Sequence, residues 1–301
     1  MVRSCGSILY RWRQAAFAKA MICWLAGGVA FAEDATPDAT NDGNVRGIMD
    51  NSFLVEEAYN QEAGVVQHIF NAFYSVRRRS GTDDELWNLS FTQEWPVFSQ
   101  KHQLSYTIPY NFVHTAGGSA DGLGDMMVHY RYQAYFDEAT LTAFAPRASL
   151  ILPTGDEKLG FGDDTVGVQV NLPFSTTIGD MWFVHLNAGF TYLPNATSAQ
   201  NRDLLSANFG ASTIYAMTRD THLMLECVGS WNQLGDPGRA LRREWVSFVS
   251  PGVRHAFNFA NGSQLVIGAA APIGISSVSP DIGAFLYLSF EHFLPGHKPE
   301  P

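Results

Sequence analysis

Ionisable and amide side chains recur at alternate positions of several otherwise apolar segments, and they are the best candidates for contact with a solute. Successive side chains of a β-strand point to opposite faces, so residues spaced by two share a face. Inside a membrane, a Glu, Arg or His must be paired or hydrated. The residues that we expect on one inward, lumen-lining face are Glu94, His129, Arg131, Gln133, Gln169, His185, Glu226 and Arg254, with Asn71, Arg147, Asn171 and Asn187 at the same parity.

Other residues of chemical interest have a spacing that argues against a site. Carboxylate oxygens are ligands that Ca²⁺ prefers, but the acidic residues between positions 156 and 164 match no regular calcium loop. They are Asp156, Glu157, Asp163 and Asp164. Cys227 is the one cysteine after residue 32, and a single thiol builds neither a disulfide framework nor a cysteine metal site. We therefore expect no metal and no cofactor.

The elements that must position the inward residues are about twelve amphipathic segments. Most are long enough to cross a hydrocarbon layer as tilted strands, which takes about 9 to 11 residues. We expect strands at 64–76, 86–97, 102–113, 123–136, 141–152, 164–174, 181–193, 204–217, 221–232, 244–257, 263–271 and 282–293.

Alternation within the strands and between their connections indicates a barrel. In segment 164–174, Val168 and Val170 share one face and Gln169 lies on the other, as a strand between lipid and lumen requires. A soluble sandwich would also alternate. The odd-numbered connections, including 114–122, are longer than the even-numbered ones, as expected when one kind lies outside the cell and the other in the periplasm. The sequence predicts an all-β, transmembrane, up-and-down antiparallel β-barrel of about 12 strands.

Tryptophan placement also favours a membrane. The Trp residues after position 32 all fall near the ends of expected strands and on the apolar face. Girdles at membrane interfaces hold amphipathic rings at this depth, whereas an ordinary core Trp would tend to lie nearer a strand centre. We expect an aromatic girdle made of Trp87, Trp95, Trp182, Trp231 and Trp245.

The first residues have the pattern of an export signal. Basic residues up to Lys19 precede the apolar run 20–32, which closes on a small-x-small site at Ala32. The run is too short for a bilayer-spanning helix, which takes about 20 apolar residues. We expect a signal peptide at 1–32 that is cleaved near Ala32, and a mature chain in the outer membrane of a Gram-negative-type cell.

The rest of the chain divides into three parts. Residues 33–63 begin as a polar periplasmic linker rich in Asp, Asn and Thr. Within it, Phe53–Glu62 would form either a short periplasmic cap or plug, or an extended lead-in to the first strand. The barrel follows at 64–293, and 294–301 is a C-terminal tail.

The last expected strand carries a pattern similar to the assembly signal of outer-membrane barrels. Asp281, Gly283, Leu286 and Leu288 follow its polar-x-Gly-x-x-apolar-x-apolar order, with a final aromatic at Phe293. The tail beyond that aromatic departs from the usual pattern. The signal makes the outer-membrane assembly machinery an expected partner.

Composition excludes some partners and favours strands. The chain has 19 Lys and Arg against 29 Asp and Glu, a net charge of −10, so we expect no nucleic-acid surface. Aromatic residues make up 13% and charged residues 16%, with 27 glycines, which suits strands and tight turns. After residue 32 no apolar run of about 18 residues occurs, so the chain would span a bilayer as strands.

Several motifs resemble those of the outer-membrane transporter family grouped under phenol meta-pathway degradation. They are Gly-Leu-Gly-Asp at 122–125, Pro-Thr-Gly-Asp at 153–156, Glu-Glu-Ala-Tyr-Asn-Gln-Glu at 56–62, Gln-Glu-Trp-Pro at 93–96 and His-Gln-Leu-Ser-Tyr at 102–106. The resemblance covers most of the chain after residue 32. It implies an outer-membrane barrel that moves small aromatic or hydrophobic solutes, and it carries over no catalytic residue.

The expected function is passage of a small solute through a porin-like transporter. The alternative is a structural or surface-interaction barrel with a plugged bore, since twelve strands lie between the filled interior of eight and the open channel of sixteen. A lipid hydrolase is a further alternative, but the nearest match to the Asn-His-x-Ser order of outer-membrane phospholipases is 111–114, which lacks it. We therefore expect no enzyme.

Two groups of arginines would face outward, in the first and fifth long loops. They are Arg77, Arg78, Arg79, Arg239, Arg242 and Arg243. Guanidinium matches phosphate geometry, so they could pair with lipopolysaccharide as well as the lipid bilayer. Pairing within the loop to Asp83, Asp84 and Glu85 is the alternative.

Two prolines conflict with the expected strands. Pro146 and Pro251 lie inside such segments, and each removes a donor from the ladder. A closed barrel tolerates this at a bulge or a kink, which we expect at both positions.

Overall fold

The computed structural model describes residues 48, 52–235 and 240–294. The expected signal peptide, most of the linker and the tail from residue 295 lie outside the described residues. Among the described residues, no helix combines the length and apolar character needed to cross a membrane.

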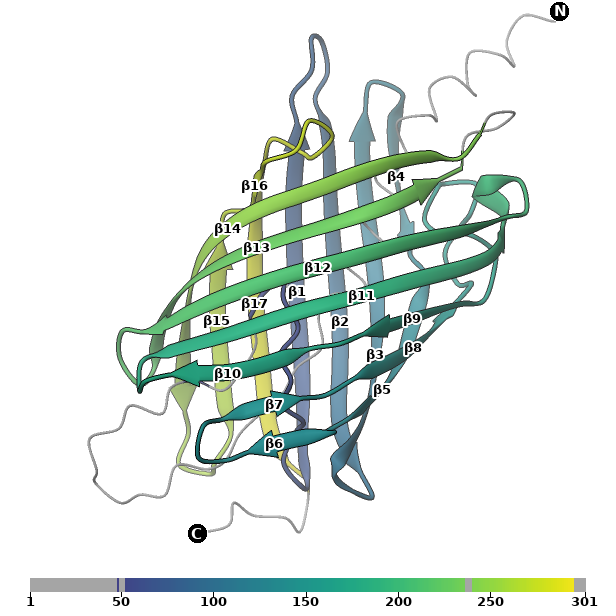
Figure 1. The fold of residues 1–301 in the computed structure, drawn as a ribbon. Helices are drawn as coiled ribbons and strands as arrows, with labels where there is room; N and C mark the ends of the chain where they lie inside the picture. The colour runs from purple at the N-terminus through teal and green to yellow at the C-terminus, as the bar shows by residue number, and fades with distance from the viewer. Residues whose placement is uncertain (1–47, 49–51, 236–239, 295–301) are drawn as a thin grey trace, which may run out of the picture.

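The strands form one closed antiparallel barrel of 12 strands, which confirms the predicted fold class (Figure 1). β1 (Val65–Arg77) pairs on one side with β2 (Asp84–Val97) and on the other with β17 (Ile282–Phe293). The first and last strands therefore close the sheet on itself. Closure matters because a free edge in lipid would leave unpaired backbone amides.

Most barrel strands are continuous. Besides β1, β2 and β17, they are β3 (Ser99–Thr115), β11 (Trp182–Ala196), β12 (Arg202–Ala216), β13 (Thr221–Leu234) and β14 (Arg242–Asn258). A short 3-10 helix at Thr197–Ala199 connects β11 to β12. Neighbours along the chain pair in antiparallel register, for example Glu226 in β13 with Ser250 in β14.

The remaining barrel strands are interrupted. They consist of β4 (Gly118–Leu123), β5 (Met126–Tyr132) and β6 (Tyr135–Asp137); β7 (Thr142–Phe144) and β8 (Arg147–Leu152); β9 (Gly167–Asn171) and β10 (Phe174–Ile178); and β15 (Gln264–Ala270) and β16 (Ile273–Gly274). Pro146, Pro173 and Pro272 lie in three of these gaps, because proline cannot donate to the ladder.

The structure places the break expected at Pro146 but not one at Pro251. Pro251 lies within continuous β14, opposite Leu225. Its carbonyl accepts the Ala271 N–H at 2.9 Å. In an antiparallel hydrogen-bonded pair both bonds join the same two residues, so the missing N–H of Pro251 faces the gap between β15 and β16. The break thus falls on the neighbouring strand.

Two expected connections are wrong in detail. The long connection at 114–122 is instead a hairpin, because β3 and β4 stay paired up to Thr115 and Gly118. The sixth strand does not end at residue 174, since pairing resumes after Pro173 and continues to Ile178. In both places backbone pairing extends through residues whose polar or turn-forming character predicts a loop.

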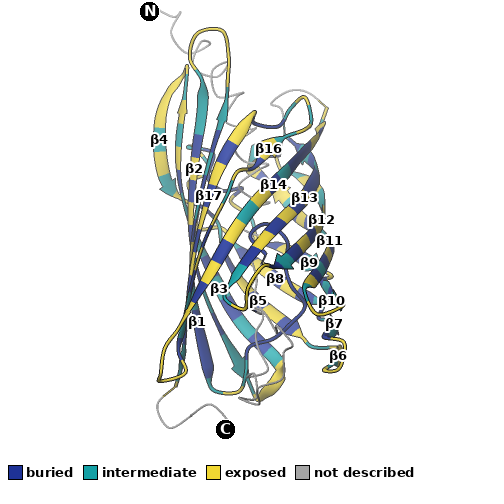
Figure 2. Ribbon diagram, turned by 90° about the vertical axis from the view of Figure 1, so that its left-hand side faces the viewer, coloured by how far each residue is buried: buried dark blue, intermediate teal, exposed yellow. Residues whose placement is uncertain are grey.

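Buried and exposed residues alternate along the strands (Figure 2), and many of the exposed residues are large and apolar. In β17, Leu286 is 57% exposed, whereas its neighbours Phe285 and Tyr287 are each 1% exposed. Large apolar residues are exposed on many strands, including Leu225 and Phe209. An outer surface with so many exposed apolar side chains suits contact with hydrocarbon.

The tryptophans lie near strand ends and outside the buried interior. Trp87, Trp182 and Trp245 are exposed, and Trp95 and Trp231 are half-buried. Trp182 begins β11, and its ring lies 4.9 Å from that of Tyr215. Their role as a membrane-interface girdle stays a prediction.

Candidate functional site

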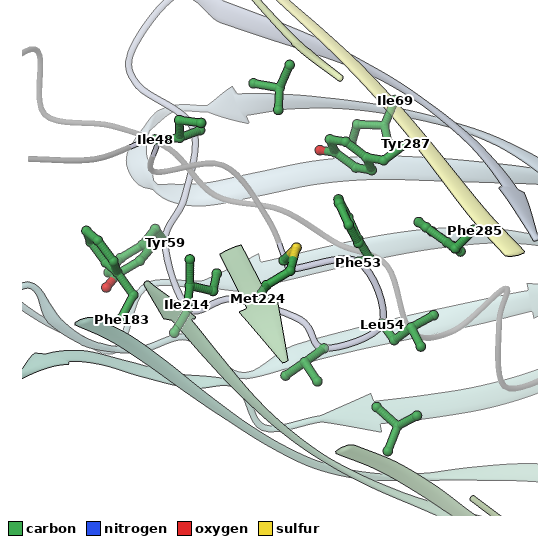
Figure 3. Close-up of a cluster of buried hydrophobic side chains, with 14 of the residues drawn as sticks. Ile48, Phe53, Leu54, Tyr59, Ile69, Phe183, Ile214, Met224, Phe285 and Tyr287 are labelled. Atoms are coloured by element: carbon green, nitrogen blue, oxygen red, sulfur yellow. The ribbon is translucent and has the colours of Figure 1, made fainter. Parts of the chain in front are cut away.

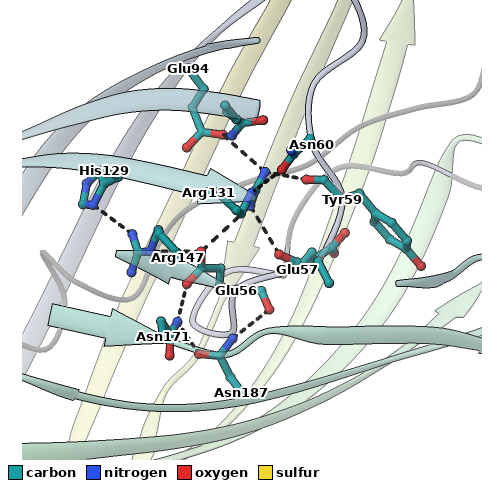
Figure 4. Close-up of polar contacts among 12 residues, drawn as sticks. Glu56, Glu57, Tyr59, Asn60, Glu94, His129, Arg131, Arg147, Asn171 and Asn187 are labelled. Atoms are coloured by element: carbon teal, nitrogen blue, oxygen red, sulfur yellow. Dashed lines mark hydrogen bonds and ion pairs between the residues drawn. The ribbon is translucent and has the colours of Figure 1, made fainter. Parts of the chain in front are cut away.

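A segment before the first strand lies inside the barrel. Residues Ser52–Gln61, called the luminal segment from here on, are all buried. Hydrogen bonds join it to Ser212 of β12, Glu226 of β13, Ser175 of β10 and Gln103 of β3. Because these strands lie on different sides of the barrel, the segment occupies the interior (Figures 3 and 4).

Side chains of the barrel wall hold the backbone of the luminal segment. The segment has no helix or strand of its own, so its buried N–H and C=O groups need other partners. Glu226 Oε1 accepts the N–H groups of Leu54 and Val55 at 2.8 and 3.1 Å. Gln133 accepts the N–H of Asn60 at 3.0 Å and donates to the carbonyl of Ala58 at 2.7 Å. Wall side chains thus replace regular backbone pairing.

Glu56 lies among cations and amides from four neighbouring strands, at β5, β8, β9 and β11. Its Oε1 is 3.1 Å from Arg147 Nε and 3.9 Å from Arg131 Nη1. Asn171 donates to its Oε2, and Asn187 donates to its backbone carbonyl at 3.0 Å. All these side chains are buried, so the carboxylate exchanges water for paired charge and amide donors (Figure 4).

Glu57 points to another part of the wall. Its Oε1 accepts the Ser52 N–H at 2.8 Å and lies 3.4 Å from His185 Nε2 and 3.9 Å from Arg254 Nη1. Burial raises the pKa of Glu57 to about 7, although the nearby Arg254 opposes this rise. The two adjacent glutamates therefore direct their carboxyl groups to different wall residues, Glu56 to Arg131 and Arg147 and Glu57 to His185 and Arg254.

Aromatic packing anchors the start of the luminal segment. The Phe53 ring lies 5.4 Å from that of Phe285 and 5.3 Å from that of Tyr287 (Figure 3). A Cβ on Gly268 would lie 2.2 Å from Phe53 Cζ, and one on Gly252 would lie 2.9 Å from its Cε2. The Phe53 ring therefore fits only because these two positions are glycines without a Cβ atom.

The expected inward residues are buried inside the barrel, and only Gln133 among them is half-buried. The structure brings together several of them around the luminal segment: Glu94 and Arg131 at 4.0 Å, Gln133, His185, Glu226 and Arg254. Gln169 and His129 lie behind them, each in contact with Arg147 at 2.9 and 3.1 Å. Whether these residues line a solute path stays a prediction.

Sequence reasoning placed Glu56 and Glu57 in a motif of the resembling family and in a possible cap or plug, and Arg147 at the inward parity, but it gave none of the three a role in the site. Arg147 has the inward parity, but nothing in the sequence shows its partner. The glutamates follow a run that resembles a polar linker. The signal that sets them apart is their position between Phe53 and Tyr59, two aromatics that suit a buried segment better than a solvated linker.

The two Gly-Asp motifs meet at one side of the barrel. Asp125, between β4 and β5, accepts the Gly155 N–H at 2.9 Å and the Asp163 N–H at 3.2 Å. It therefore fastens both ends of the connection 155–163. A Cβ on Gly155 would lie 2.2 Å from the Phe161 carbonyl oxygen, so this compact loop requires glycine there.

The acidic residues of this loop make local hydrogen bonds. Asp156 Oδ1 accepts the N–H groups of Lys158 and Leu159 at 2.8 and 3.2 Å, and Ser198 donates to Asp163. Within the described part of the chain, no group of three or more potential ligands could hold a metal ion.

Three of the outward arginines contact carboxylates or an aromatic ring of the protein itself. Arg79 forms an ion pair with Asp84, and Arg242 Nη1 lies 2.7 Å from Glu244 Oε1. The Arg243 guanidinium lies 5.7 Å from the centre of the Trp231 ring, an arrangement typical of a cation–π contact. Contacts within the protein therefore account for part of the positive charge of these arginines.

No protein-family model matches the sequence, and no curated protein matches it. Among solved structures, the chain is similar to the COG4313 outer membrane channel from Pseudomonas putida F1, with a TM-score of 0.58 at 16% identity over 77% of this chain and 96% of that one. The translocator domain of autotransporter NalP from Neisseria meningitidis has a TM-score of 0.49 at 11% identity, over 96% and 100% of the two chains. The first likeness shows that this chain has the fold of an outer-membrane β-barrel.

Proposed function

We propose that the chain is an outer-membrane barrel through which a small solute passes, and that the luminal segment is its internal closure. The observation that carries the proposal is a segment without regular secondary structure, held inside a barrel with an apolar outer surface by side-chain contacts alone. Each contact between segment and wall is non-covalent, so the segment can leave without breaking the barrel.

The closed arrangement leaves little room for a solute. The side chains that surround the luminal segment are buried, including Arg131, Arg147 and Arg254, which are among the largest fully buried side chains. Passage therefore requires displacement of the segment. Once it leaves, the wall presents charged and amide groups of the kind that select a solute in a water-filled path.

Other parts of the proposal rest on the sequence. The preference for aromatic or hydrophobic solutes, and the grouping under phenol meta-pathway degradation, rest on the family resemblance. Export with cleavage near Ala32 rests on the N-terminal pattern, and delivery by the assembly machinery rests on the last strand. Contact between the outward arginines and lipopolysaccharide rests on guanidinium chemistry.

Locking the segment to the wall tests the closure. Ser52 Oγ and Ser212 Oγ are 2.6 Å apart, so a cysteine pair at these positions, in a C227A background, suits a disulfide. We expect single-channel steps in planar bilayers when the pair is reduced and none when it is oxidised. Equal conductance in both states would refute closure by the segment. No conductance in either state would favour the plugged structural barrel.

A second cysteine pair controls for oxidation itself. Thr92 and Thr107 lie on adjacent wall strands with their Oγ1 atoms 2.8 Å apart. A T92C/T107C disulfide would join the wall to itself and leave the segment free. We therefore expect oxidation of this pair to leave conductance unchanged. Uptake of labelled aromatics by cells with and without the chain then tests the solute preference.

A further inference from the structure

The wall groups around Glu56 form a recognisable carboxylate-binding arrangement. Arg131 of β5, Arg147 of β8 and Asn171 of β9 converge on this one carboxylate from adjacent strands (Figure 4). Guanidinium groups and amide N–H groups are the donors that proteins use to bind carboxylates. All three side chains are buried, and wall residues outside the luminal segment also hold Arg147, through its contacts with His129 and Gln169.

The carboxylate bound there belongs to the movable segment and not to the wall. The carboxylate nearest to Arg131 after Glu56 is that of the wall residue Glu94, at 4.0 Å, which does not depend on the luminal segment, whereas the ion pair of Arg147 with Glu56 does. Arg147 also contacts the neutral Gln169 side chain and His129. Loss of the Glu56 carboxylate removes negative charge from beside the Arg147 guanidinium, so this part of the wall attracts a replacement anion.

Glu56 also fits the site imperfectly. Its Oε1 lies near Arg147 Nε without hydrogen-bond geometry, and neither atom has a hydrogen-bond partner. The backbone of Glu56 is fixed by Asn187, which limits how far its carboxylate can move. A free carboxylate has no such tether and can align with the guanidinium.

We propose that Arg131, Arg147 and Asn171 form a binding site for a small organic carboxylate, and that Glu56 occupies this site while the barrel is closed. The solute and the luminal segment then compete for the same donors. This inference deepens the proposed function by naming the solute class, and it rests on that function for its physiological meaning.

The test measures binding of acetate to the full chain in detergent by saturation-transfer NMR. In the wild type, Glu56 competes with acetate. In E56A the carboxylate is gone and the donors remain, so we expect the acetate Kd to fall at least tenfold. Acetamide, which has the same shape and no charge, should bind at least tenfold more weakly than acetate to E56A. The double variant E56A/R147M should lose the gain in acetate affinity that E56A shows.

Three results would overturn the inference. They are equal acetate affinity in wild type and E56A, equal affinity of E56A for acetate and acetamide, and full acetate affinity in E56A/R147M. If E56A does not fold, E56S supplies the same comparison, because the short serine side chain also leaves the space of the carboxylate empty and the donors in place. The acetate experiment measures equilibrium binding, whereas the disulfide between positions 52 and 212 is tested by conductance. Either experiment can therefore fail while the other succeeds.

Discussion

Removing the Phe53 ring should release the luminal segment and leave the wall intact. Phe53 is fully buried against Phe285 and Tyr287, and it is not part of any barrel strand. Truncation of a buried Phe to Ala costs about 3–5 kcal/mol. Each 1.4 kcal/mol changes an equilibrium about tenfold, so about 3 kcal/mol shifts the balance between docked and released segment by more than a hundredfold.

The assay for F53A is the labelling of a cysteine at position 52 by a water-soluble thiol reagent, in the C227A background. Ser52 is 1% exposed, so labelling reports release of the segment. We expect F53A to speed labelling about a hundredfold, in line with the shift worked out above. F73A is the matched control, because Phe73 is a buried aromatic of the wall strand β1. A change below threefold in F53A, or equal acceleration in F73A, would refute the reasoning.

Three further predictions concern other parts of the structure. G268V should displace Phe53, since a Cβ there would lie 2.2 Å from its ring, and single-channel open probability should rise; an unchanged open probability would contradict this packing. D125N should weaken the fastening of the connection 155–163 by about 1–3 kcal/mol, seen as faster proteolysis within it, whereas equal proteolysis would argue against the clamp. L225R should lower stability in lipid vesicles by about 2–4 kcal/mol, and a neutral result in urea unfolding would place position 225 away from hydrocarbon.

The barrel could be predicted from the sequence because lipid and interior impose opposite demands on alternate residues. In β17, Leu288 and Phe290 face outward while Ser289 and Glu291 face inward, and this period of two is visible in the sequence. Inward aromatics such as Phe285 carry no polarity signal. Their direction follows from parity with neighbours and not from residue type.

The breaks within the barrel strands and the extension of the β3–β4 hairpin were harder to predict from the sequence. A proline within a pattern indicates a lost donor, but the sequence does not say which strand bends. At Pro146 its own strand breaks, whereas at Pro251 the partner strand breaks beside Ala271. The choice depends on which neighbour faces the missing N–H, a property of register that a single sequence does not contain.

For the luminal segment, the sequence left two alternatives open, a short periplasmic cap or plug and an extended lead-in to the first strand. The residues of the segment have no strand periodicity, because its backbone pairs with side chains and not with another strand. A run such as Glu56–Glu62 has the composition of a solvated linker, and composition does not distinguish a hydrated carboxylate from one paired with Arg147. Long-range pairing between residue 56 and residue 147 becomes visible only in the fold.

The most direct test of the account is to record one locked channel before and after reduction. With cysteines at 52 and 212 oxidised, a molecule in a planar bilayer should show no current steps, and addition of a reductant to the same bilayer should start them. Steps of the same size and frequency before reduction would contradict closure by the luminal segment.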